Sequence, residues 1–139
     1  MLSKVISGYE RISIGEFKSM SVSKKYYVIA GYDLTRFRTN NYEDWKWTKE
    51  GEELTYNQRK GCIQLFDDPM SGLHLYLGYI LASADEYEFE TVKINWAEAS
   101  RQEPLVCQKL KQLIDANVMP DVFNSKDLRY ELIVFEECC

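Results

Sequence analysis

The chain has 139 residues, of which 45% are apolar and 14% aromatic, and its net charge is −5. This composition excludes a disordered chain, and the length predicts a single domain, residues 1–139, that needs no disulfide or metal ion to fold. Residues 1–61 carry eleven Lys and Arg against eight Asp and Glu, whereas residues 62–139 carry six against fourteen. The acidic balance argues against a nucleic-acid-binding domain, which is normally basic as a whole.

The N-terminus and the cysteines bear on the cellular compartment. The N-terminus has no apolar run of signal-peptide length, and the longest apolar stretch, 73–84, is too short to span a membrane. The four cysteines, Cys62, Cys107, Cys138 and Cys139, lack the C-x-x-C spacing of a zinc or redox site. We therefore expect a cytoplasmic protein with reduced thiols, no membrane association, no bound metal and no cofactor.

The first predicted elements are strands, because apolar residues alternate with polar ones. A strand is expected over 25–34. The segment 45–56, in which Trp45 and Trp47 alternate with polar residues around a charged turn, is interpreted as a β-hairpin.

Three further strands are predicted at 61–66, 73–82 and 87–94. Their short connections predict that successive strands pair antiparallel, as a β-meander. The alternation changes phase near Glu90 and Thr91. A β-bulge is expected there, because one extra residue inverts the alternation.

One helix is well marked in the C-terminal half. Pro104 suits the first turn, Asn117 can adopt the left-handed conformation that ends a helix, and Pro120 prevents continuation. The apolar residues at helical spacing between them are Val106, Leu110, Leu113 and Ile114. Residues 95–101 either begin this helix or form a separate turn, and a last strand is expected over 129–135.

These elements predict the fold class. It is α+β, a mostly antiparallel meander sheet with one main helix from the C-terminal half packed on a face. Leu77 and Leu113 lie on the apolar faces that should meet. The opposite sheet face carries Tyr76 and Ile80, so it should also be covered, by an N-terminal segment or by another subunit.

The sequence offers little catalytic equipment. His74 is the single histidine, which excludes multi-histidine metal sites, and no glycine-rich phosphate loop occurs. His74 is interpreted as a packed or edge-exposed strand residue rather than a catalytic base. Asp67 and Asp68 could hold magnesium, but Pro69 and Gly72 explain the segment as a turn.

The most unusual stretch is 33–47, where arginines and aromatic residues are interleaved with polar ones. Trp, Tyr and Arg dominate the energetic hot spots of protein interfaces. The predicted partner-binding residues are Arg36, Arg38, Tyr42, Trp45 and Trp47. The alternative is that the tryptophans form an inward strand face and the arginines are solvated.

These features favour a non-enzymatic protein-interaction module, an inhibitor or adaptor. They fit small accessory proteins of phages and mobile elements, including viral proteins that block a host enzyme. The second hypothesis is a small-ligand or nucleotide-binding domain, with the chain as a homo-oligomer, that uses Arg36, Arg38 and the aromatic residues. The third is an enzyme with an unfamiliar site around Asp67, Asp68 and His74.

Overall fold

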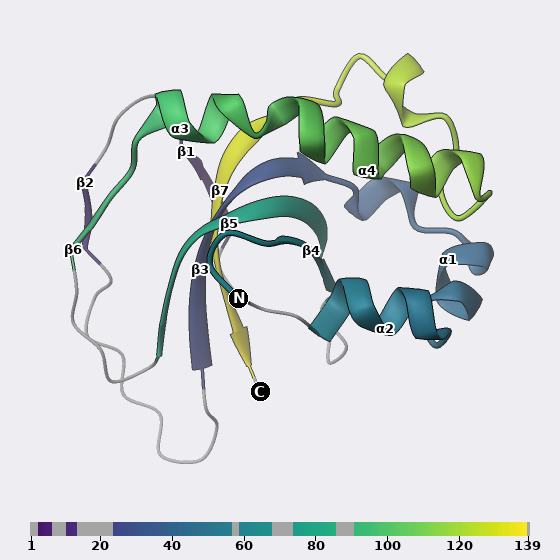
Figure 1. Cartoon of the computed structure of the whole chain (residues 1–139), viewed down its shortest axis with the longest axis horizontal. Coiled ribbons are helices and arrows are strands. Elements are labelled where there is room, and N and C mark those ends of the chain that lie inside the picture. Colours follow the sequence, from purple (N-terminus) through teal and green to yellow (C-terminus); the bar gives the residue numbers. More distant parts are fainter. Residues whose placement is uncertain are drawn as a thin grey trace.

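The computed structural model of the chain describes the segments 3–6, 11–13, 24–56, 59–67, 74–85 and 91–138 (Figure 1). Its strands are β1 (Ser3–Ile6), β2 (Arg11–Ser13), β3 (Lys24–Asp33), β4 (Ile63–Asp67), β5 (Leu75–Asp85), β6 (Thr91–Lys93) and β7 (Glu131–Cys138). Its helices are α1 (Asn40–Trp45), α2 (Lys49–Tyr56), α3 (Trp96–Arg101) and α4 (Glu103–Asp115), with 3-10 turns η1 (Thr35–Phe37) and η2 (Val122–Asn124).

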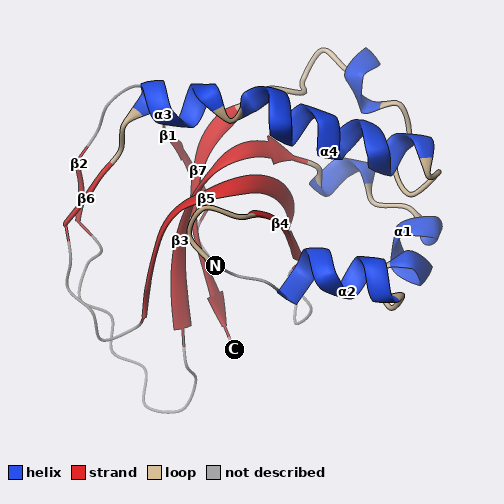
Figure 2. Cartoon of the chain, viewed as in Figure 1, coloured by secondary structure: helices blue, strands red, loops and turns tan. Residues whose placement is uncertain are grey.

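The predicted α+β fold class is confirmed. Five strands form an antiparallel sheet in the order β1-β7-β3-β5-β4, and β2 pairs with β6 in a separate two-stranded ribbon. Figure 2 shows α3 and α4 following one another along one side of the large sheet, with α1 and α2 at its end. The described helices are all too short or too polar to traverse a lipid bilayer.

The predicted β-meander is only partly confirmed. β4 and β5 pair as expected, but β6 pairs with β2 and not with β5, because β5 lies between β3 and β4 in the sheet. Glu90 lies outside the described residues, so the bulge predicted there is not described. Within the described residues, a register shift occurs between β3 and β5, where Val28 faces Ala82 and Ile29 faces Ile80. Leu81 is therefore the extra residue.

Both faces of the sheet are buried. On the α4 side, Leu77 and Leu113 share one core cluster, which confirms that their apolar faces meet. On the other face, the rings of Phe66 and Phe135 lie 5.0 Å apart, although two strands separate β4 from β7. A flat sheet would place those strands about 14 Å apart, so the sheet must curl around this aromatic cluster.

The main helix, α4, matches its prediction. Pro104 lies in its first turn, and its buried residues are Val106, Leu110 and Leu113. Asn117 follows it with a left-handed φ of 63°. Residues 95–101 do not begin α4, because α3 is a separate short helix. Its N-cap, Asn95, accepts a hydrogen bond from the Glu98 backbone N–H over 3.3 Å.

The hairpin expected over 45–56 is wrong, because the segment forms the end of α1 and all of α2. Side-chain caps start both helices. Thr39 Oγ1 accepts from the Tyr42 backbone N–H over 3.0 Å, and Thr48 Oγ1 accepts from the Gly51 backbone N–H over 3.2 Å. Such caps satisfy backbone donors that a helix start leaves unpaired.

Gly51 lets α2 begin directly against the end of α1. A Cβ at position 51 would lie 2.3 Å from the Trp45 carbonyl oxygen. We expect Gly51→Ala to lower the free energy of unfolding by about 1–3 kcal/mol, because the backbone must shift to relieve the clash. Chemical denaturation checks this, with Glu52→Ala on the exposed side of α2 as the control. Equal midpoints for the two variants would contradict the close packing.

Candidate binding groove

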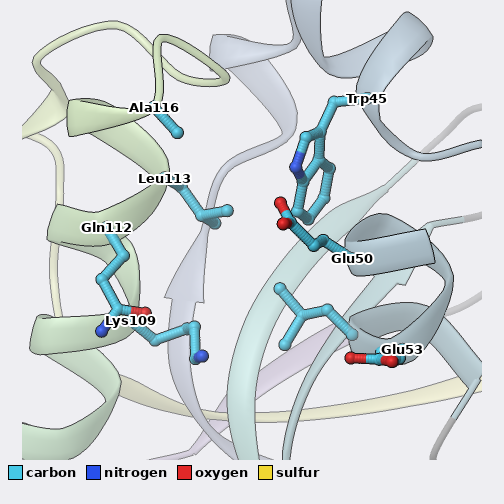
Figure 3. A pocket seen from close by; sticks show the side chains of 8 residues that line it. Trp45, Glu50, Glu53, Lys109, Gln112, Leu113 and Ala116 are labelled. Carbon is cyan, nitrogen blue, oxygen red and sulfur yellow. The ribbon is translucent and has the colours of Figure 1, made fainter. Parts of the chain in front are cut away.

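A groove opens between α2 and α4, at the end of the sheet. Its volume is about 350 Å³. Its lining residues are Trp45, Glu50, Glu53, Leu54, Lys109, Gln112, Leu113 and Ala116. Figure 3 shows Trp45, Glu50 and Glu53 on one side of the groove, while Lys109 and Gln112 extend from α4 on the opposite side. The groove therefore has an apolar interior and a polar rim.

Trp45 also lines a second, neighbouring hollow. That hollow has a volume of about 380 Å³ and shares Ala116 with the first. Trp45 is half-buried and packs against the core cluster, with its ring centroid 6.2 Å from that of Tyr42. Since Tyr42 is fully buried, the core holds the indole in place as a wall between the two hollows.

Trp47 lies two residues beyond Trp45 and is 69% exposed. The Lys46 ammonium lies 5.5 Å from the centre of its ring, a cation–π distance. An exposed indole offers a partner a large contact area from a side chain with few rotatable bonds. We use the name tryptophan surface for Trp47 together with the groove that Trp45 lines, which are linked by their neighbouring positions in the chain.

The charges at the tryptophan surface are unequal on its two sides. Glu50 and Glu53 lie one turn apart on α2, and Asp44 lines the second hollow. Lys109 lines the groove from α4, across from the two glutamates. Within the part of the chain that the structure describes, none of these four side chains forms an ion pair.

A charged network beneath this surface anchors α1 to the sheet. Arg38 donates to Asp67 over 2.7 Å, to Glu43 over 2.9 Å and to the His74 carbonyl over 3.1 Å. Asp67 also accepts from the Tyr42 hydroxyl over 3.1 Å and from the Lys46 ammonium over 3.4 Å. The end of β4 is thereby joined to the segment that carries Trp45.

The network shifts the pKa values of its members. Burial would raise the pKa of Asp67, but the hydrogen bond and charge of Arg38, with the charge of Lys46, hold it below its ordinary value. Burial and the neighbouring Asp67 carboxylate raise the pKa of the Tyr42 hydroxyl. Asp67 is therefore a charged acceptor and Tyr42 a neutral donor at pH 7.

The five residues predicted to bind a partner lie in different environments. Arg36 is exposed and pairs with Asp127 over 2.6 Å, while Arg38 belongs to the charged network. Tyr42 is fully buried, so it supports the tryptophan surface from beneath. Trp45 is half-buried in the groove wall and Trp47 is exposed.

Sequence reasoning missed the other walls of the groove. Glu50, Glu53 and Leu54 lie within the segment predicted as a hairpin, and Lys109 is not among the predicted binding residues. The helical spacing of the two glutamates on one side of α2 was the available signal. Nothing local indicated that α4 would lie opposite them, because that contact joins segments more than fifty residues apart.

Two residues of the hypothetical enzyme site, Asp67 and His74, form contacts with other side chains of the fold. Asp67 is the last residue of β4 and belongs to the charged network, while Asp68 lies outside the described residues. His74 is buried as expected for a packed residue: its ring stacks on Tyr76 at 4.6 Å, and Nε2 lies 3.3 Å from Glu137 Oε1. Among the described side chains, no group of His, Cys, Asp and Glu could hold a metal ion.

Comparisons with known proteins give no relative from which a function could be inferred. Neither the protein-family models, nor the curated proteins, nor the solved structures contain a match to this chain. Any functional conclusion therefore rests on the tryptophan surface and its surroundings.

Proposed function

We propose that this chain is a protein-interaction module, an inhibitor or adaptor, that binds its partner through the tryptophan surface. Two observations carry the proposal: Trp47 is 69% exposed, and Trp45, two residues before it in the chain, walls a groove. Tryptophan is enriched in hot spots, because it gives a large contact area from a side chain with few rotatable bonds.

The environments of Arg36 and Arg38 favour this function over nucleotide binding. Phosphate recognition needs guanidinium groups that are free to pair with an anion. Arg38 already donates to two carboxylates and a carbonyl, and Arg36 pairs with Asp127. The carboxylates of Glu50 and Glu53 at the groove would repel a phosphate.

The variants Trp45→Ala and Trp47→Ala test the proposal. We expect Trp47→Ala to weaken binding about thirtyfold, since an exposed anchor contributes 2 kcal/mol or more. Its free energy of unfolding should change little, because a surface residue leaves no cavity. Trp45→Ala should reduce both affinity and stability, since its ring also packs on the core.

The measurement is affinity capture from the native host, with the tagged full chain as bait, followed by calorimetric titration of the stoichiometric partner. Phe123→Ala is the control, because Phe123 is an exposed aromatic residue on η2 and lies outside the groove lining. The identity of the partner shows whether it is a host enzyme that this protein inhibits. Unchanged affinity in both tryptophan variants, or a co-purifying nucleotide without any protein partner, would contradict the proposal.

A further inference from the structure

We infer that the groove between α2 and α4 receives an arginine side chain of the partner, stacked on Trp45 and paired with Glu50 and Glu53. This inference rests on the proposed function, because it names what the partner inserts at the tryptophan surface. It commits to a cationic anchor rather than an apolar one.

The interior of the groove suits the stem of a long side chain. The Trp45 ring, Leu54 and Leu113 provide apolar walls. Arginine buries its methylene groups along such surface while its charged end stays near water. A guanidinium plane also stacks on an indole face, and tryptophan is the best aromatic partner for a cation.

The α2 rim has the charge that this head group requires. Glu50 and Glu53 line the groove, are exposed and form no ion pair with any described residue. Glu50 and the Trp45 indole line the same side of this groove, so a guanidinium stacked on the indole could reach the Glu50 carboxylate. Carboxylates bind guanidinium with two parallel hydrogen bonds, which a lysine ammonium cannot form.

The two described cations of the charged network, Lys46 and Arg38, are paired with other carboxylates. Lys46 follows Trp45 in sequence, but its ammonium pairs with Glu43 over 2.6 Å and with Asp67 over 3.4 Å. Arg38 is held by the same two carboxylates. Among the described residues, the carboxylates of Glu50 and Glu53 thus have no cationic partner, and we infer that they are available to a group from outside.

Lys109 provides a test in which the expected change in arginine affinity is opposite to that of the glutamate variants. Its side chain lines the groove from α4, across from the two glutamates. A cation that enters the groove is repelled by this ammonium and attracted by the glutamates. Removal of the lysine charge should therefore strengthen arginine binding, whereas removal of either glutamate charge should weaken it.

The experiment is an NMR titration of the ¹⁵N-labelled full chain with blocked tripeptides. The probes are Ala-Arg-Ala, Ala-citrulline-Ala, which keeps the shape without the charge, and Ala-Leu-Ala. The signal is the indole N–H resonance of Trp45, assigned with Trp45→Phe. The variants are Glu50→Gln, Glu53→Gln and Lys109→Gln, with Glu52→Gln as the matched control, because Glu52 is exposed on α2 and does not line the groove.

We expect a saturable shift with the arginine peptide and binding weaker by roughly fivefold or more with the other two peptides. Glu50→Gln and Glu53→Gln should weaken arginine binding, Lys109→Gln should strengthen it, and Glu52→Gln should leave it unchanged. Added salt should weaken it as well, since exposed charges are screened.

The inference is overturned if the leucine peptide binds as well as the arginine peptide, if the glutamate variants bind like wild type, or if no peptide gives a saturable shift. The proposed function is tested separately by partner binding of the tryptophan variants. Loss of partner binding in those variants, with full partner binding in Glu50→Gln and Glu53→Gln, would reject the arginine anchor alone.

Discussion

Replacing Leu77 or Leu113 by alanine is expected to lower the free energy of unfolding by about 2–5 kcal/mol. Leu77 is completely buried in β5, and Leu113 in α4 is 4% exposed. Both belong to the cluster that joins the sheet to α4. Truncation removes apolar contacts and leaves a cavity that the surrounding structure only partly fills.

Urea denaturation monitored by circular dichroism measures this loss. The matched control is Leu105→Ala, since Leu105 also lies on α4 but is 53% exposed. Its midpoint should stay close to that of wild type. A wild-type midpoint for Leu77→Ala, or equal losses for the leucines at 105 and 113, would show that α4 packs differently.

Asp67→Ala is expected to lower the free energy of unfolding by about 2–3 kcal/mol, because it leaves buried or half-buried donors without their acceptor. The groups affected are the Arg38 guanidinium, the Tyr42 hydroxyl and the Lys46 ammonium. The side chain of Asp67 is only 11% exposed, so water cannot easily replace it.

The pH dependence of stability gives a second measurement on Asp67. Its pKa is lowered in the folded protein, so folding favours the ionised form. The stabilisation is complete above the unfolded-state pKa, which is about 3.9, and is lost as the pH falls through the lower folded-state value. Wild type and Asp67→Asn should therefore differ at pH 7 and converge in acid.

Asp127→Asn is the control for this pair of measurements. Asp127 also pairs with an arginine, Arg36, but both side chains are mostly exposed, at 70% and 64%. Solvent-exposed ion pairs of this kind add little to stability. If Asp127→Asn lowered the free energy of unfolding as much as Asp67→Asn, the burial of Asp67 would not explain the contribution of the charged network to stability.

Local patterns were enough to predict α4 and β3. The apolar residues of α4 repeat at helical spacing, and the helix has its own signals at Pro104 and Asn117. β3 was predicted over 25–34 and forms over Lys24–Asp33. These elements are predictable because their start, their end and their buried face are encoded within a few neighbouring residues.

The segment around the tryptophans shows how a local pattern can mislead. Trp45 and Trp47 alternate, which favours a strand, yet the caps at Thr39 and Thr48 start helices. Trp45 is the last residue of α1, whereas Trp47 lies in the turn between α1 and α2, so the two do not follow the alternation of a strand. The result is one indole in the groove wall and one in solvent, and not a shared inward face.

The sequence by itself determined the α+β class, the main helix, the apolar faces that meet at Leu77 and Leu113, and Trp45 and Trp47 as binding candidates. Only the tertiary structure decided that β6 pairs with β2, that Arg38 forms an ion pair with Asp67, and that α4 lies across the groove from α2. Periodicity and caps act between near neighbours in the chain. Strand partners, ion pairs and groove walls join distant segments, and they depend on how the whole chain buries its apolar surface.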